Sequence, residues 1–232
     1  MTRFLNQKVI QVGGKLTVMC MPSVGLDQIA HNAPGVIGNA RNVLTSVLRV
    51  MAGPTMAKTT TRLLSKYFDP QKTGLTEGDI RFVRRLLVVT LTGLSGDQTI
   101  KVGRHVSKDG SNVLGEVSYD RKLRKPYHSR APHLGKGIKK TVWGAIKLEV
   151  DCFDDEDYAT RVLIHEATHK YAGADDRSYF DDHGENPKGR NTNADARINA
   201  DTYAWFAMSL YHAELADIAQ RVEGFAALPL GF

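Results

Sequence analysis

Two histidines four positions apart, in a segment with the marks of a single helix, constrain the fold of this chain more than any other feature. The segment over residues 154–173 opens with an acidic run at 154–157 and closes at Gly173. Acidic residues favour the N-terminus of a helix through the helix dipole, and glycine favours the position just past its C-terminus. We therefore predict one helix here, with His165 and His169 on one face, about one turn apart.

The two histidines form an H-E-x-x-H motif over residues 165–169, directly behind the apolar run 162–164. Histidines at this spacing on a helix can share one zinc ion. Glu166 lies on the flank of the same face, where it can take a proton from a water at the metal. The alternative interpretation is a pair of surface histidines on an amphipathic helix. The position of the motif inside a predicted helix favours the zinc site.

A catalytic zinc needs three protein ligands and one open position, so a third ligand must be found. The extended pattern H-E-x-x-H-x-x-G-x-x-H fails, because Ala172 and Asp175 stand where it requires glycine and histidine. The nearest candidates are Asp175 and Asp176, just past the glycine turn. The residues alone also leave four more distant candidates open, which are His183, Glu185, Glu214 and Glu223.

The motif and the residues after it, H-E-A-T-H followed by G-A-D-D-R-S-Y, resemble the aspzincin metallopeptidases, the deuterolysin and peptidyl-Lys metalloendopeptidase group. The pattern of that family is H-E-x-x-H followed by G-T-x-D-x-x-Y-G. The resemblance implies that His165, His169 and Asp176 bind one Zn²⁺ per chain. It also implies that Glu166 is the general base and that Tyr179 stabilises the oxyanion.

This chain departs from the family pattern at two positions, where Ala174 replaces threonine and Phe180 replaces the last glycine. Neither change removes a reacting group. The resemblance therefore implies a zinc-dependent metalloendopeptidase that hydrolyses peptide bonds in a protein or peptide substrate. The alternatives are a basic nucleic-acid-associated zinc protein, and a non-catalytic binding protein with a vestigial zinc site.

A second segment, N-A-D-T-Y over residues 199–203, is similar to the N-A-D-S-Y segment of the same family. If residues 198–222 are helical, they are apolar nearly all round, which predicts a buried helix behind the motif helix. Asp201 is costly in such a helix unless it is partnered. It is either bonded to a ligand histidine or a backbone N–H, or it forms a pocket wall that attracts a substrate lysine. Lysine-specific relatives have a second acidic residue where this chain has Ala204.

The N-terminal half predicts a hairpin over residues 8–21 and a linker over 22–40. Residues 41–67 have helical character, broken at Gly53-Pro54. The following stretch, 68–80, has the offsets of a calcium loop but ends in isoleucine where a bidentate glutamate is needed, so we expect a turn instead.

After this turn we expect a helix over residues 77–92, capped by Thr76 and Asp79. Strands are expected within 96–120 and 142–150. The expected elements and the family resemblance together predict an α+β fold. This fold is a zincin-like domain that is mostly helical with a small mixed β-sheet and has the motif helix at its cleft. We assign residues 31–232 to this domain and residues 1–30 to an N-terminal hairpin extension.

Positive charge is concentrated over residues 121–140, while the whole chain carries a net charge of +6. That segment contains a single aromatic residue, Tyr127, so it lacks the stacking platform of single-strand nucleic-acid binders. We expect a solvated loop here. The secondary interpretation is that this segment contacts an acidic partner, such as an immunity or inhibitor protein. Nucleic acid is the less favoured partner, and its binding would weaken steeply with salt.

Residues 1–26 lack a signal-peptide pattern, and the sequence contains no apolar run as long as a membrane span. The two cysteines, Cys20 and Cys152, do not make a disulfide framework. We expect synthesis in the cytoplasm, no membrane partner, and export, if any, by a signal-independent secretion system. A bacterial secreted effector is the corresponding hypothesis.

Overall fold

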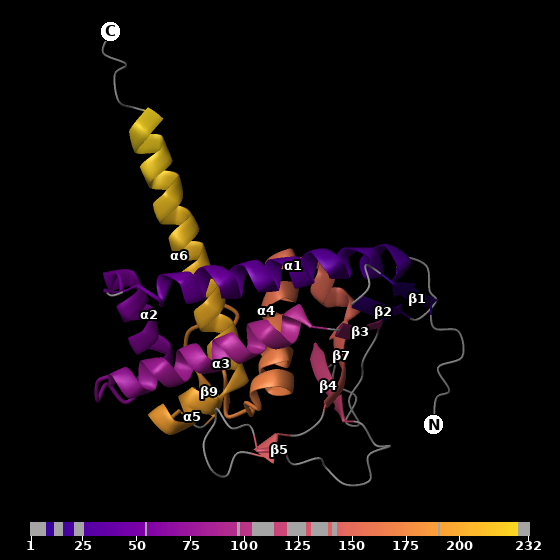
Figure 1. Ribbon diagram of the computed structural model, residues 1–232, viewed down its shortest axis with the longest axis horizontal. Coiled ribbons are helices and arrows are strands. Elements are labelled where there is room, and N and C mark those ends of the chain that lie inside the picture. The colour runs from indigo at the N-terminus through magenta and orange to yellow at the C-terminus, as the bar shows by residue number, and fades with distance from the viewer. Residues whose placement is uncertain are drawn as a thin grey trace.

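Long helices pack on a small mixed β-sheet in this computed structural model (Figure 1). The structure describes residues 8–11, 16–20, 26–53, 55–96, 98–103, 114–119, 129–130, 139–140, 143–189 and 191–226. The basic segment over 121–140 lies outside these residues, apart from the backbone pairing of β5 (Ser129–Arg130) with β6 (Lys139–Lys140). The predicted partner contact of that segment therefore stays a prediction.

The five-stranded sheet has the order β1-β2-β3-β7-β4. Strands β2, β3 and β7 are parallel, while β1 and β4 run antiparallel to their neighbours. The predicted hairpin and strands are thus confirmed, and the hairpin belongs to the same sheet as the later strands. The strands are β1 (Lys8–Gln11), β2 (Leu16–Cys20), β3 (Gln98–Gly103), β4 (Gly115–Tyr119) and β7 (Trp143–Glu149).

The first helix, α1 (Leu26–Val50), shows that the linker predicted for residues 22–40 is wrong from residue 26 onward. Pro34 lies inside the helix, where proline costs a backbone hydrogen bond. Burial outweighs that cost, since one face of the helix lies in the core through Ala33, Val36, Ile37, Ala40, Val43, Leu44 and Val47. The domain boundary that we predicted at residue 30 falls within this helix.

The next two helices, α2 (Lys58–Phe68) and α3 (Glu77–Ser95), are joined by a turn built on Asp69. The Asp69 carboxylate accepts the backbone N–H groups of Thr73 at 2.9 Å and Gly74 at 2.8 Å. Its oxygens thus face their own loop, and Oδ1 also accepts from Asn193 Nδ2 at 2.7 Å. Thr76 and Asp79 form the predicted capping box at the start of α3. Both the turn and the helix start are confirmed.

Helix α4 (Glu156–Ala167) follows a short 3₁₀ turn over Val150–Asp154, and it leads into a π-helical turn, η2 (Thr168–Ala172). The predicted motif helix is therefore confirmed, with a change of helical type at its end. Two short strands, β8 (Ser178–Tyr179) and β9 (Lys188–Gly189), pair beyond it. The chain then forms α5 (Asn193–Ile198) and α6 (Ala200–Ala226).

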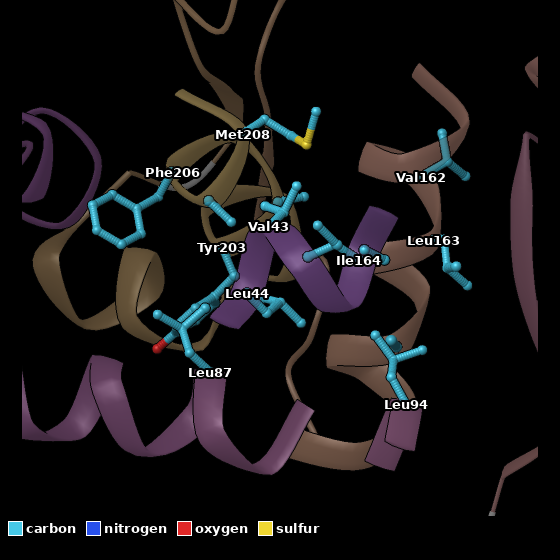
Figure 2. Close-up of a cluster of buried hydrophobic side chains, with 14 of the residues drawn as sticks. Val43, Leu44, Leu87, Leu94, Val162, Leu163, Ile164, Tyr203, Phe206 and Met208 are labelled. Atoms are coloured by element: carbon cyan, nitrogen blue, oxygen red, sulfur yellow. The ribbon is translucent and has the colours of Figure 1, made fainter. Parts of the chain in front are cut away.

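Figure 2 shows buried side chains of α1, α3, α4 and α6 in the core, to which α2 and strands β3, β4 and β7 also contribute. The apolar residues of α4 just before the motif lie in this core and fix the helix against α6. The second half of α6 extends past α1 in Figure 1, and Leu215 and Ile218 are 45% and 46% exposed. The prediction of a buried helix over 198–222 therefore holds only for its first half. None of the described helices is long and apolar enough to span a bilayer.

Candidate metal centre

The end of α4 turns the chain back toward its own histidines. The π-helical turn begins where the Thr168 hydroxyl donates to the Ile164 carbonyl at 2.7 Å. Gly173 then ends the helix in the left-handed region, with φ 70°. Helices often end at a residue in the left-handed region, and that residue is usually glycine. The reversal sends the following residues back along the histidine-bearing face, and π-turns of this kind are frequent at functional sites.

The returning loop is held by Asn199, at the junction of α5 and α6. Its side-chain oxygen accepts the backbone N–H groups of Arg177 at 2.8 Å and Ser178 at 3.2 Å. In addition, the Asp175 N–H donates to the Ile198 carbonyl at 2.7 Å. These bonds fix the backbone on both sides of Asp176, so the N-A-D segment supports the loop that carries the third candidate ligand.

Three ligand atoms converge on this face. His165 Nε2 lies 3.0 Å from His169 Nε2, and Asp176 Oδ1 lies 3.2 Å and 3.1 Å from the two nitrogens. Among the described residues, these three form the group of His, Cys, Asp or Glu side chains whose ligand atoms lie close enough to share a metal ion. Asp175, the other near candidate, is instead paired with Arg177 at 2.8 Å and exposed. Glu185 is paired with Lys66.

The donor set is suited to zinc. Tetrahedral zinc with bonds of about 2.0–2.1 Å separates its ligand atoms by about 3.3 Å, close to the observed spacing. Two imidazoles and one carboxylate are ordinary zinc ligands. Asp176 is 41% exposed, so the group is open on one side, as a catalytic site requires.

Hydrogen bonds behind the histidines set their orientation. His169 Nδ1 lies 2.9 Å from the Ala174 carbonyl, which can only accept, so Nδ1 carries the proton and Nε2 is available to a metal. His165 Nδ1 lies 3.4 Å from Asp201 Oδ1, and Asp201 Oδ2 accepts the Phe180 N–H at 2.7 Å. These contacts offset the cost of burying Asp201, which is 4% exposed.

The electrostatics favour positive charge at the centre. Burial alone would lower the pKa of His165, but the carboxylates of Asp176 and Asp201 overcome it and raise that pKa to about 10. Burial would raise the pKa of Asp176, but hydrogen bonds from the two histidines hold it well below its usual range. Ligand histidines must be neutral, so a metal ion that binds here displaces protons.

Glu166 and Tyr179 complete the surroundings of the three ligands. Glu166 is buried, its Oε1 lies 3.9 Å from His165 Nε2, and burial raises its pKa. Tyr179 is 53% exposed and stacks on the His165 ring with centroids 6.3 Å apart. Burial of its hydroxyl, followed by the charge of Asp176, raises the Tyr179 pKa, so the hydroxyl keeps its proton as a donor.

Glu166, Tyr179 and two of the three candidate ligands, His165 and Asp176, line a cleft of about 340 Å³. Its lining residues are Leu114, Gly115, Tyr158, Arg161, Val162, His165, Glu166, Asp176, Tyr179 and Asp201. A larger cavity, of about 690 Å³ beside α2, contains none of the three candidate ligands, so size alone does not mark the site.

Arg161 and Gly115 are among the cleft-lining residues that sequence reasoning missed. Arg161 stands four positions before His165, so helical spacing could have placed it on the same face. Gly115 had no such signal, because its role depends on the packing of β4 against α4. A Cβ atom at Gly115 would lie 2.6 Å from Glu166 Oε1, so the strand backbone approaches this carboxylate closely.

The fold is similar to that of a zinc peptidase from Grifola frondosa. The TM-score is 0.51 and the sequence identity 14%, over 82% of this chain and 98% of the other. The likeness shows the fold, and the α+β zincin-like class predicted from the sequence is confirmed. No protein-family model matches the sequence, and no curated protein sequence does.

Proposed function

We propose that this chain is a zinc-dependent metallopeptidase that cleaves internal peptide bonds of proteins or peptides. The observation that carries the proposal is the convergence of the ligand atoms of His165, His169 and Asp176 at a cleft that Glu166 and Tyr179 also line. A likeness of fold to a zinc peptidase supports it.

The residues divide the chemistry among them. His165 Nε2, His169 Nε2 and Asp176 Oδ1 would hold Zn²⁺, which when bound supplies Lewis acidity and lowers the pKa of water to about 7. Glu166 would accept the proton of the attacking water and return it to the leaving amine, a role suited to a buried carboxylate with a raised pKa. Tyr179 would donate a hydrogen bond to the oxyanion that develops on the carbonyl.

The predicted preference for lysine requires that Asp201 be free to meet a substrate cation. Its carboxylate accepts the Phe180 N–H and lies against His165 and Arg161. We therefore propose a peptidase in which Asp201 orients His165, and the lysine preference is not part of the proposal. The effector role and the export route remain hypotheses from the sequence.

The test is a cleavage map with a matched control. Wild type, Glu166→Gln and Glu116→Gln are loaded with zinc, their metal content is measured, and each digests a denatured protein mixture with and without chelator. Glu116 lies on β4, is 50% exposed and pairs with Lys147 at 2.8 Å, and its charge is only the last of the causes that raise the pKa of Glu166, so this variant changes a nearby charge without removing the proposed base.

We expect Glu166→Gln to keep about one zinc per chain and to lose cleavage by about 10²- to 10⁴-fold, the usual contribution of a general base. Glu116→Gln should keep both zinc and cleavage. Cleavage by Glu166→Gln at the wild-type rate, or cleavage that persists in chelator, would overturn the proposal.

A further inference from the structure

One charged side chain in the cleft has no part in the proposed chemistry. Among the described residues that line the cleft, Arg161 is the one whose side chain always carries a positive charge. It lies one turn before His165 on α4, so the two side chains neighbour each other on the helix face. Its side chain is only 15% exposed, so its charge is partly shielded from water and acts strongly on whatever enters the cleft.

The guanidinium is held in place by aromatic rings. Its central carbon lies 4.2 Å from the centroid of the Trp205 ring and 4.8 Å from that of Tyr158. Such cation–π contacts hold an arginine by the planar face of its guanidinium. Arg161 is thus a fixed cation rather than a freely moving surface side chain.

Asp201, the nearest acidic group, is an incomplete partner for this cation. Arg161 Nη1 lies 3.8 Å from Asp201 Oδ1, whereas a charge-assisted hydrogen bond measures about 2.7–2.9 Å. The two Asp201 oxygens are also shared with the Phe180 N–H and with His165 Nδ1. A guanidinium has five N–H donors, so the long contact to Asp201 and a hydrogen bond to the Tyr158 hydroxyl leave capacity for another oxygen ligand.

The surroundings of Arg161 limit how deep an anion can go. Arg161 and Tyr158 line both the cleft and a second cavity of about 500 Å³. The wall of that cavity carries three carboxylates, from Asp155, Asp157 and Asp182. An anion that entered from the side of the metal ligands would be attracted by Arg161 and repelled beyond it, so it would stop beside the candidate metal centre.

We infer that Arg161 determines specificity by binding a carboxylate of the peptide substrate next to the scissile bond. The inference rests on the proposed peptidase function. Two sources supply this chemistry, an aspartate or glutamate side chain within the peptide or the carboxylate at its C-terminus. A lysine at the same position is disfavoured, because its ammonium would meet the Arg161 charge.

Binding measurements in a background that cannot cleave test the inference directly. Zinc-loaded Glu166→Gln is titrated calorimetrically with peptides of one length, which differ only in a central Glu, Gln or Lys and in a free or amidated C-terminus. Arg161→Gln and Arg161→Lys are added to this background, with Arg81→Gln as the matched control. Arg81 is 70% exposed and pairs with Glu77 on α3.

We expect a carboxylate-bearing peptide to bind about tenfold tighter than the uncharged one, which corresponds to about 1.4 kcal/mol. Arg161→Gln should abolish the difference, Arg161→Lys should keep part of it, and Arg81→Gln should keep it all. A preference that follows the central Glu assigns the side-chain source, and one that follows the free C-terminus assigns the other. Equal affinities, or a preference that survives Arg161→Gln, would overturn the inference.

The cleavage map separates this inference from the proposed function. If the cuts depend on metal but show no acidic residue and no C-terminus at a constant distance from the cleaved bond, the proposed peptidase function is retained and the inferred role of Arg161 is contradicted. Binding that depends on Arg161, together with no cuts, removes the peptidase function and leaves a carboxylate-binding site. Zinc content and the unfolding temperature of each variant show whether Arg161→Gln has kept its fold, and Arg161→Lys retains the charge if it has not.

Discussion

Asp201 acts, at the scale of single residues, through the histidine that it touches. Its Oδ1 lies 3.4 Å from His165 Nδ1, while Oδ2 is fixed by the Phe180 N–H at 2.7 Å. A carboxylate in this position holds the ring and makes the other nitrogen a better ligand. An amide cannot accept from both donors and carries no charge.

Asp201→Asn should therefore weaken zinc binding by about 10- to 100-fold, the usual effect of such a partner. Competition with a chelator of known affinity measures this change. Asp175→Asn is the control, since Asp175 Oδ1 accepts the Asp176 N–H at 3.0 Å and an asparagine oxygen can do the same. Equal zinc affinity in the two variants would show that Asp201 does not support His165.

The candidate ligands differ in how far the sequence could predict them. His165 and His169 follow from helical spacing alone. Helical spacing could not choose between Asp175 and Asp176, because the choice depends on a π-turn, a left-handed Gly173 and bonds from Asn199 far along the chain. The sequence indicated Asp176 only through its resemblance to a family. The cost of burying Asp201 predicted a partner, but the structure was needed to show that the partner includes His165.

Gly93 determines, at the scale of elements, how closely α3 approaches the π-turn. A Cβ atom there would lie 2.1 Å from the Tyr171 ring, which is far inside van der Waals contact. Gly93→Ala must displace either the ring or the helix that carries it. We expect a loss of about 1–3 kcal/mol in the free energy of unfolding, as for other overpacked sites.

Gly38→Ala in α1 is the matched control, because a Cβ atom there has nothing within 4 Å. Alanine costs less conformational entropy in a helix, so this change should stabilise the protein by about 0.5–1 kcal/mol. Urea denaturation of both variants measures the difference. A neutral or stabilising Gly93→Ala would show that Tyr171 moves away freely.

Asp79 caps α3 and also pairs with Arg197 of α5. The N–H and hydroxyl of Thr76 lower the pKa of Asp79, and the charge of Arg197 adds to this effect. A lowered folded-state pKa means that the stabilisation is present above the unfolded pKa of about 3.9 and is lost as pH falls through the folded value.

We expect Asp79→Asn to be less stable than wild type at pH 7, by about 1 kcal/mol. The deficit should shrink as the pH falls below about 4, where the wild type also loses its charge. Unfolding free energies measured across this range test the expectation. A deficit that stays constant with pH would mean that the carboxylate charge contributes nothing to the cap.

Capping and turn chemistry made α3 predictable, since Thr76, Asp79 and the turn at Asp69 act within a few residues of one another. The first half of helix α1 was missed because Pro34 and its neighbouring glycines suggest a loop, whereas the helical character predicted from residue 41 onward is confirmed. The burial that outweighs them comes from contacts with other elements. Local signals therefore predicted the elements whose stability is local, and failed where tertiary packing decides.

The contrast between local signals, which can be predicted, and tertiary packing, which cannot, also holds for the whole molecule. Strands could be recognised along the chain, but the order β1-β2-β3-β7-β4 could not. That order puts β4 at one edge of the described sheet, where Gly115 reaches Glu166. The cleft thus depends on a contact between residues 51 positions apart, for which the sequence offers no spacing rule.

The placement of the candidate ligands predicts how the whole molecule responds to loss of metal. All three come from one continuous stretch, residues 165–176, while most of the core comes from other elements, which are α1, α2, α3, α6 and the sheet. Removal of zinc should therefore leave the fold intact and lower its stability only by mass action. At a free zinc concentration 100 times the dissociation constant, this amounts to about 2.7 kcal/mol.

For a chain of this size, we expect chelation to lower the unfolding temperature by about 5–10 °C. The far-ultraviolet circular dichroism at 25 °C should not change. Asp176→Asn, which lacks one candidate ligand, should unfold at a lower temperature than zinc-loaded wild type and should respond little to the chelator. Loss of helical signal when zinc is removed from the wild type would instead assign the metal a structural role, because the core would then depend on it.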